Sequence, residues 1–577
     1  MDVSSGGSSD TQKRNSYRWG LVGALALAFG IVAATPSCSV VVDTSTKQCD
    51  VNTDCPNGMK CEEGVCVGGG DVLCAKTSDC SAAGEQQFCR KSPGETSGVC
   101  RPLLSPECQV VEGDPTADNV FLIGSIHPTT ATGFDGTIGV SMENSVRLAI
   151  RDLKSNVGGL PLPGGAGVRP VVMIGCTDAG EGSVSVKAAK HLIDDLGVQA
   201  IIGGAFSSVA IPTADTTVLG GALLISASAT GIALTDFPDK PAGATAGLVW
   251  RTVPSDLFQA NAILQYVPQL EKRVREELGL TSDEQIKLAL VHKGDVYGKG
   301  LRSALETTLT FNEKTVVENG ANFLLVDYGD PEGTTKYPET IEAVKNHGSH
   351  IVLLIGTGEA VSALYGPIEI GWNSALGYKP RYVFSDSNYN TGALAGAIDV
   401  GADAVAKADW RKRTTGVVPG PQNTDQNFQL FVNLYGTTFG TENGDPSILG
   451  AASAYDAAYL LFYSASTISD GVITGRKLAA GMTRMSNADP ADAEINSGPG
   501  KLSDTMKKLM SGEYKSIDYN GAFGPLDFDP ETNDPEANVQ VFCLSDDGTG
   551  KTKEQLSGLY YEAESQTLKG TFTDACK

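Results

Sequence analysis

Residues 198–230 read VQAIIGGAFSSVAIPTADTTVLGGALLISASAT, and this stretch decides the fold class. Its two apolar runs, VQAIIGG and GALLISA, are too short for helices and contain no proline. The residues between them have the amphipathic pattern of a helix. Short apolar runs on either side of a helix indicate a β-α-β unit whose strands are buried on both faces of a parallel sheet.

Small polar residues follow both apolar runs. Ser207 and Ser208 follow the first run, and Ser228, Ala229 and Thr230 follow the second. In open α/β sheets, ligands bind beyond the carboxyl ends of the strands, and a hydroxyl-bearing loop before a helix suits an anionic group such as a carboxylate. No nucleophile, metal-ligand cluster or phosphate-binding motif accompanies these residues. We therefore predict a site that holds a ligand, with no catalysis, cofactor or metal.

Length and charge narrow the functional classes. With 577 residues, the chain is expected to form two or three domains. The net charge of -24 argues against binding to nucleic acid and against electrostatic docking to anionic lipid.

The N-terminal region has the features of an export signal. Lys13, Arg14 and Arg18 supply positive charge, and residues 21–34 form an apolar segment. This segment is shorter than the roughly 20 residues that span a bilayer. It therefore predicts a signal peptide over residues 1–37.

Cys38 is the predicted lipidation site. It ends the stretch Thr-Pro-Ser-Cys at 35–38, and bacterial lipoprotein signals end in a small residue followed by the modified cysteine. Residues 38–48 would then tether the protein to the membrane. The chain has 13 cysteines, an odd number, so lipidation of Cys38 leaves an even set for disulfides. Ordinary cleavage with a soluble product and an uncleaved membrane anchor are the alternatives.

Two cysteine-rich stretches form an internal repeat. They read CDVNTDCPNGMKCEEGVC (49–66) and CAKTSDCSAAGEQQFCRKSPGETSGVC (74–100). Both open with Cys-x5-Cys and close on Gly-Val-Cys, and such core-poor modules need cross-links to fold. We predict a disulfide-tied stalk over 49–108 and a linker over 109–118, with three connectivities open in each module. The candidate disulfide cysteines are Cys49, Cys55, Cys61, Cys66, Cys74, Cys80, Cys89, Cys100, Cys108, Cys176, Cys543 and Cys576.

From Asn119 onward, strand patterns alternate with helix patterns. Such alternation predicts a doubly wound α/β architecture with right-handed crossovers. The region is too long for one such sheet, so we expect two lobes. The predicted strands include NVFLIGSI (119–126), PVVMIGCTD (170–178), IKLALVH (286–292), HIVLLIGTG (350–358) and RYVFSDS (381–387).

Four stretches resemble a known family in the family's own order. They are residues 201–235, ALVHKGDVYGKGLRSAL (289–305), GAASAYDAAYLLFYSA (450–465) and GAFGPLDFDPETND (521–534). Together they resemble the leucine/isoleucine/valine-binding proteins, which are type I periplasmic binding proteins of ABC importers.

The resemblance implies two Rossmann-like lobes joined by three crossovers, with a small disulfide-rich segment before them. The ligand would lie in the cleft between the lobes, which would close by a hinge motion. The implied crossovers lie near 251–255, 417–422 and 525–529. The binding domain would cover 119–545, with lobe one over 119–252 and 420–525, lobe two over 255–416 plus the C-terminal strands, and a C-terminal extension over 546–577.

The resemblance also implies roles for residues of lobe one. Ser207, next to Ser208, matches the serine that takes an amino-acid carboxylate. Ser228, Ala229 and Thr230 match the loop that contacts the carboxylate and the ammonium group. The alternatives are that Ser207 only caps its helix and that the second loop is a plain turn.

Residues of lobe two would complete the site. Tyr297 matches the aromatic residue that closes over the ligand, and Asp386 stands near the acid that pairs with the ammonium group. Phe134 lies roughly where a first-loop tyrosine is expected. The sequence departs from the family at Thr357 and Gly358, where a further aromatic is usual. A solvated acid at 386 and a packing role for Tyr297 are the alternatives.

These observations predict an extracytoplasmic solute-binding protein of the bacterial cell envelope. It would capture an amino acid or a similar small polar solute and pass it to an ABC permease or another envelope partner. The alternatives are a sensory receptor of the same fold, whose cysteine-rich stalk binds a protein, and a surface protein that binds nothing. An enzyme of a related α/β fold has no catalytic motif to support it.

Overall fold

The computed structural model describes residues 49, 51, 60–62, 64–67, 72–83, 86–420, 425–440, 442–486 and 491–576. They fall into two compact units, 49–67 and 72–576, and each unit is described by itself. The predicted signal peptide, Cys38 and Cys55 lie outside the described residues. Among the helices that are described, none is long and apolar enough to cross a membrane.

The first unit contains part of the first cysteine-rich module. Its strands β1 (Lys60–Glu62) and β2 (Val65–Val67) pair in antiparallel orientation. A disulfide joins Cys49 to Cys61, and Cys66 is also disulfide-bonded. The first and third cysteines of this module are therefore linked.

The second cysteine-rich module belongs to the larger unit. Its three-stranded antiparallel sheet consists of β3 (Leu73–Cys74), β4 (Gln87–Arg90) and β5 (Gly98–Pro102). Disulfides join Cys74 to Cys89 and Cys80 to Cys100, and these four cysteines form the core of the module. Covalent links thus replace the apolar core that so short a segment cannot form.

Lobe one is built on a six-stranded sheet in the described chain, with the order β13-β12-β11-β7-β10-β6. All neighbours pair in parallel except β6, which runs antiparallel to β10 and is joined to it by the Cys108–Cys176 disulfide. The strands are β6 (Cys108–Glu112), β7 (Phe121–His127), β10 (Val171–Thr177), β11 (Ala200–Gly203), β12 (Leu223–Ser226) and β13 (Val249–Arg251).

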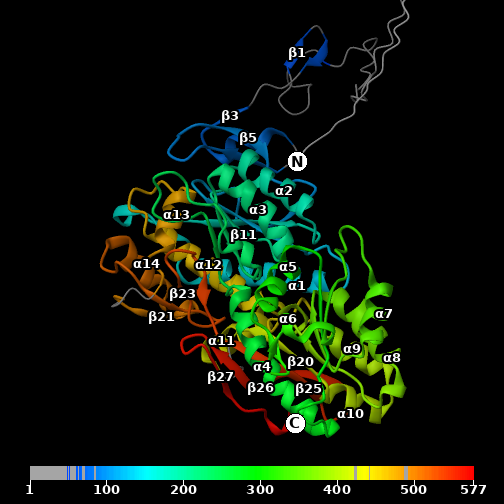
Figure 1. Ribbon diagram of the computed structural model, residues 1–577. Helices are drawn as coiled ribbons and strands as arrows, with labels where there is room; N and C mark the ends of the chain where they lie inside the picture. Colours follow the sequence, from blue (N-terminus) through cyan, green and yellow to red (C-terminus); the bar gives the residue numbers. More distant parts are fainter. Residues whose placement is uncertain are drawn as a thin grey trace, which may run out of the picture. The chain divides into compact units, whose positions relative to one another are not determined.

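Helices cover both faces of this sheet because its strands are apolar on both sides. Ile123, Met173 and Ile202 pack toward α1 and α12, whereas Leu122 and Val172 pack toward α2 and α3. Figure 1 shows α2 and α3 on one side of β11 and α12 on the other. The helices of lobe one are α1 (Phe134–Asn156), α2 (Gly182–Lys190), α3 (Ser207–Gly220), α11 (Gln426–Phe439), α12 (Ala451–Ser466), α13 (Gly475–Met482) and α14 (Leu502–Ser511).

Lobe two contains an eight-stranded sheet within the described residues, with the order β17-β14-β18-β19-β20-β25-β26-β27. The first five strands are parallel, and the last three continue the sheet in antiparallel orientation. Cys543 in β25 is disulfide-bonded to Cys576. The strands are β14 (Leu288–His292), β17 (Phe323–Asp327), β18 (Ile351–Ile355), β19 (Arg381–Phe384), β20 (Thr414–Pro419), β25 (Val539–Asp546), β26 (Thr552–Glu562) and β27 (Thr567–Gly570).

The second sheet is covered in the same way. Leu288 and Leu353 belong to the apolar cluster formed with α4 and α5, and Ala289 and Leu354 belong to the cluster on the opposite face. The helices of lobe two are α4 (Asp256–Leu278), α5 (Val296–Glu306), α6 (Val316–Asn319), α7 (Tyr337–His347), α8 (Gly366–Ile370), α9 (Ala393–Gly401) and α10 (Ala404–Lys412). The short strand pairs are β8 (Leu160–Pro161) with β9 (Val168–Arg169), β15 (Thr310–Phe311) with β16 (Lys314–Thr315), β21 (Glu494–Asn496) with β22 (Asp518–Asn520), and β23 (Asp527–Phe528) with β24 (Pro535–Glu536).

The chain passes between the two sheets three times. It leaves the first sheet after β13 and enters α4, returns after β20 into α11, and passes again from β24 into β25. The predicted fold class, two α/β lobes with disulfide-bonded cysteines before them, is confirmed. Both sheets therefore direct the carboxyl ends of their parallel strands toward the loops that carry the candidate site.

Candidate functional site

Ser207 lies at the start of α3, directly beyond the end of β11. Phe206 occupies the N-cap position, so Ser207 is the first residue of the helix. Its buried hydroxyl accepts a hydrogen bond of 3.0 Å from the Gly231 backbone N–H. A Cβ at position 231 would lie 2.7 Å from the Ser207 Oγ, so glycine permits this close approach. The two loops that follow β11 and β12 are thereby joined.

Thr230 connects these loops to lobe two. Its carbonyl oxygen accepts a hydrogen bond of 2.8 Å from the backbone N–H of Asp256, the first residue of α4. Gln259, one turn later, donates from Nε2 to the Asp256 Oδ1 at 2.8 Å. The Gln259 Oε1 accepts from the Asp386 backbone N–H at 2.9 Å.

Tyr297 and Asp386 meet on the lobe-two side. The Tyr297 hydroxyl donates to the Asp386 Oδ1 at 2.6 Å, and both side chains are buried. Hydrogen bonds thus connect lobe one to lobe two through one continuous set of residues, which we call the cross-lobe network. Its members are Ser207, Thr230, Gly231, Asp256, Gln259, Tyr297 and Asp386.

Two buried carboxyl groups dominate the electrostatics of this network. Burial raises the pKa of Asp256 well above its ordinary value, and the neighbouring Asp386 charge raises it further. Burial also raises the pKa of Asp386. The Asp256 Oδ2 has no hydrogen-bond partner among the described residues. A buried acceptor without a donor is costly. A ligand with a positively charged group or a hydrogen-bond donor could supply the bond that the Asp256 Oδ2 lacks in the described structure.

The other predicted residues lie outside the cross-lobe network. The Ser228 hydroxyl donates to the Ala205 carbonyl at 2.6 Å, and the Ala229 carbonyl accepts from Arg251 at 3.4 Å. Ser208 lines a neighbouring cavity between the lobes. Phe134 begins α1 and faces position 358 of lobe two, where a Cβ would lie 4.0 Å from its own Cβ. Phe134 thus approaches the place where the family usually has its own aromatic residue.

Acidic side chains surround a second part of the cleft. Asp135 of lobe one is half-buried. Its pKa is raised mainly by burial and also by the Glu359 charge of lobe two. Asp178 is fully buried, with a pKa raised to about 7 by burial and by the nearby Asp135 charge. Its Oδ2 has no hydrogen-bond partner in the described part of the chain. Lys293 supplies the nearby positive charge, with its Nζ 3.1 Å from the Asp295 Oδ2.

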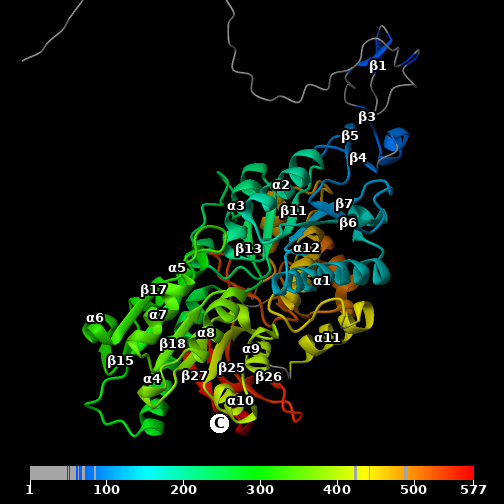
Figure 2. The same ribbon diagram turned by 90° about the vertical axis from the view of Figure 1, so that its right-hand side faces the viewer.

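A cavity of about 950 Å³ opens between the lobes beside these groups. It is lined from lobe one by residues of α3 and by Ile232, and from lobe two by residues of α5. Figure 2 shows α5 between α3 and the body of lobe two. At Gly300 of α5, a Cβ would lie 3.8 Å from the Ile232 Cβ, so the two lobes are in direct contact here.

Sequence reasoning missed Asp256, Gln259, Asp135 and Asp178. Asp256 and Asp135 each stand in the first turn of a helix, where an acid is ordinarily explained by the helix dipole. Asp178 directly follows β10, and this position at the carboxyl end of a strand is the one signal that could have identified it.

The fold and the interlobe site define a class of two-lobed ligand-binding proteins. The sequence profile described as "Periplasmic binding protein" matches residues 123–549. The chain therefore belongs to the periplasmic binding protein family. The resemblance found in the four sequence stretches is confirmed at the level of the family.

Individual relatives show the extent of the similarity. The chain is 30% identical over 207 residues to the Leu/Ile/Val-binding protein BraC3 of Rhizobium johnstonii, which covers 36% of this chain and 48% of the relative. The chain thus spans about half the length of the curated relatives it matches.

Solved structures with the same fold cover more of the chain. The branched-chain amino acid transporter substrate binding protein LivJ from Streptococcus pneumoniae, in complex with isoleucine, has a TM-score of 0.51 and 16% identity over 76% of this chain and 99% of its own. A solute binding protein from Rhodopseudomonas palustris in complex with 3,4-dihydroxy benzoic acid has a TM-score of 0.51 and 14% identity over 79% and 99%. At these identities, both structures establish the fold alone.

Proposed function

We propose that this protein is an extracytoplasmic solute-binding protein that captures an amino acid or a similar amine-bearing polar solute by closure of its two lobes. The bound solute would then be delivered to an ABC-type permease in the cell envelope. Membership of the periplasmic binding protein family and the similarity to Leu/Ile/Val-binding proteins support solute binding and export from the cytoplasm.

The observation that carries the proposal is the buried pair Asp256 and Asp386 in the cross-lobe network. Two carboxyl groups in one buried place repel each other when both ionise, and the pair is stabilised by a cation. An α-ammonium group supplies both the charge and the hydrogen-bond donors that the Asp256 Oδ2 lacks in the described structure. The Ser207 hydroxyl and the N-terminus of α3 suit the carboxylate of the same solute.

The acidic lining of the neighbouring cleft agrees with a solute that carries an amino group. Asp135, Asp178 and Glu359 bring like charges together across the lobes against the single nearby positive charge of Lys293, and this excess of negative charge opposes closure when no cationic solute is bound. A positively charged solute would offset this repulsion and so favour the closed arrangement.

The experiment is a thermal-shift screen of the protein against amino acids and small amines, followed by calorimetric titration of each hit. We expect Asp386→Asn to weaken binding of the hit at least about tenfold, since a hydrogen bond to a charged group contributes about 1.5–3 kcal/mol. Asp470→Asn, at an exposed ion pair with Lys477, is the control and should bind as the unaltered protein does. A hit whose affinity is the same in the Asp386→Asn protein would contradict the proposed site.

A further inference from the structure

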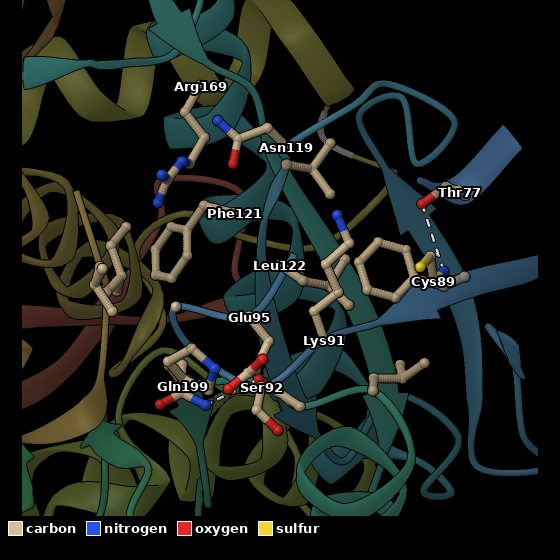
Figure 3. Close-up of a pocket in the computed structure, with 18 of the residues that line it drawn as sticks. Thr77, Cys89, Lys91, Ser92, Glu95, Asn119, Phe121, Leu122, Arg169 and Gln199 are labelled. Atoms are coloured by element: carbon tan, nitrogen blue, oxygen red, sulfur yellow. Dashed lines mark hydrogen bonds between the residues drawn. The ribbon is translucent and has the colours of Figure 1, made fainter. Parts of the chain in front are cut away.

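A second cavity, of about 300 Å³, lies between the second cysteine-rich module and lobe one. On the lobe side it is lined where strands of the first sheet begin, at Phe121 of β7 and at Gln199 just before β11. This is the edge opposite the carboxyl ends that carry the cross-lobe network. We call it the junction cavity. Figure 3 shows its lining, with Lys91 coming from the module and Arg169 from the lobe.

The junction cavity is basic in a strongly acidic protein. Its charged lining residues are Lys76, Lys91 and Arg169 against the single acid Glu95, whereas the whole chain has a net charge of -24. No ion pair to Arg169 or Lys91 occurs among the described residues. Arg169 is partly buried, and this burial lowers its pKa below the ordinary value.

One buried guanidinium N–H group of the cavity lining lacks an acceptor. Arg169 donates from Nη2 to the Gly471 carbonyl at 2.9 Å, but its buried Nε has no hydrogen-bond partner within the described structure. The Nε of Arg90, a residue outside the cavity lining, also lacks a hydrogen-bond partner among the described residues, and it lies 3.5 Å from where a Cβ on the lining residue Gly197 would be. Unsatisfied buried donors of this kind are rare, and an anionic acceptor would satisfy them.

The rest of the lining combines polar residues, among them Thr77, Ser92, Asn119 and Gln199, with apolar ones. Phe121 is buried, and its ring lies next to the Arg169 side chain in the view of Figure 3. Phe88 and Ile473 complete this side of the cavity. A bare inorganic anion would leave the apolar part of the lining without a partner, whereas a carboxylate with a short apolar group would contact both kinds of surface.

We propose that the junction cavity binds a small organic carboxylate, whose head group is held by Arg169 and Lys91 and whose apolar part packs on Phe121 and Phe88. The ligand would bridge the module and lobe one. This site is separate from the interlobe cleft and does not depend on the solute captured there.

The test is calorimetric titration of the full chain with hexanoate and, separately, with inorganic phosphate. We expect hexanoate to bind and to raise Tm, and phosphate to bind at least tenfold more weakly. Arg169→Gln and Lys91→Gln should each weaken hexanoate binding at least tenfold. Arg484→Gln is the matched control, since Arg484 is also a half-buried arginine that donates to backbone carbonyls, at Lys515 and Tyr514, away from this cavity.

Further measurements distinguish specific binding in the junction cavity from adventitious binding and from binding of the solute in the cleft. Circular dichroism checks that each variant folds. If Arg169→Gln does not fold, the hexanoate affinity of Lys91→Gln still tests the proposal. Asp386→Asn should leave hexanoate binding unchanged, whatever it does to the solute of the cleft. The proposal is overturned if hexanoate does not bind, if phosphate binds as tightly, or if the Arg169 and Lys91 variants bind hexanoate as the Arg484 variant does.

Discussion

At the scale of single residues, Asp256 combines a cost to the fold with a role in the proposed site. Its carboxyl group is fully buried, it lies near Asp386, and its Oδ2 lacks a partner in the described structure. A buried polar group that hydrogen-bonds a ligand lacks this hydrogen bond before the ligand binds, which lowers the stability of the unliganded protein. Such groups are a common origin of trade-offs between stability and function. The dipole at the N-terminus of α4 favours the ionised carboxylate by about 0.3–1 kcal/mol, and by up to about 2 kcal/mol in a partly buried geometry, so it offsets part of the cost of burial.

Asp256→Asn tests this trade-off. The amide has the same shape and no charge, so we expect a higher free energy of unfolding for the unliganded protein at pH 7.5, together with affinity for an amine-bearing solute that is lower by at least about tenfold. Urea unfolding and calorimetry measure the two quantities. A variant that is both less stable and equally tight in binding would refute the assignment.

Asp178 predicts how stability depends on pH. Its pKa is raised in the folded protein to about 7, from 3.8, mainly by burial and also by the charge of Asp135. Between these two pH values, the folded state keeps a proton that the unfolded state has lost, so this group's contribution falls as pH rises from about 4 to 7. Each pKa unit corresponds to about 1.4 kcal/mol.

Asp178→Asn should therefore stabilise the protein more at pH 8 than at pH 5. The comparison uses the free energy of unfolding in urea for the two proteins at both pH values. Equal effects at pH 5 and pH 8 would show that Asp178 titrates normally in the folded state.

At the scale of elements, α5 and the turn that contains Ile232 determine how closely the lobes approach. Gly300 lies where a Cβ would be in ordinary contact with Ile232, at 3.8 Å. Gly300→Leu places a larger side chain at this contact, so we expect the closed arrangement to be hindered and solute affinity to fall at least about tenfold. Calorimetry and small-angle X-ray scattering with the solute present measure affinity and closure.

Gly300→Ala is the control for this change. Its single methyl group fits the contact distance, so it should close and bind as the unaltered protein does. If Gly300→Leu closes on solute as completely as Gly300→Ala, the contact along α5 does not limit closure.

The elements themselves were largely predictable from the sequence. The strand predicted over 286–292 is β14 (288–292), and that over 381–387 is β19 (381–384), because continuous apolar runs between turn residues define buried parallel strands. Helix α1 begins at Phe134. The first turn of α1 places Phe134 and Asp135 at the cleft. The apolar periodicity of the sequence does not predict this turn, because the turn does not continue the apolar pattern.

The site was predictable only in part, for a physical reason. Ser207, Thr230, Tyr297 and Asp386 do lie in one hydrogen-bonded network, as the family resemblance suggests, although their roles toward a ligand stay predictions. Gln259 joins Asp256 to Asp386 across more than a hundred residues of chain, and local pattern contains no trace of such a contact. The cleft acids Asp135, Asp178 and Glu359 likewise come together only in the folded protein, where the two lobes face each other.

At the scale of the whole molecule, the three passages between the sheets make the cleft, and the cysteine-rich module is attached to one lobe. Within the larger unit, the module contacts lobe one around the junction cavity, and the Leu103 carbonyl lies 3.2 Å from the His191 Nε2 after α2. The Cys108–Cys176 disulfide then fastens the next strand to β10 of the first sheet. The N-terminal part of this unit is thus built into lobe one by covalent and non-covalent contacts.

This attachment has a mechanical consequence. A pull on the chain ahead of the second module enters lobe one through the module's disulfides and the Cys108–Cys176 bond, and is borne by the first sheet. The three segments that connect the two sheets, where we expect the hinge, lie beyond this point in the chain, so the pull does not pass through them. If Cys38 is lipidated, as the sequence predicts, tension on the anchored molecule would leave the proposed opening and closing of its lobes undisturbed.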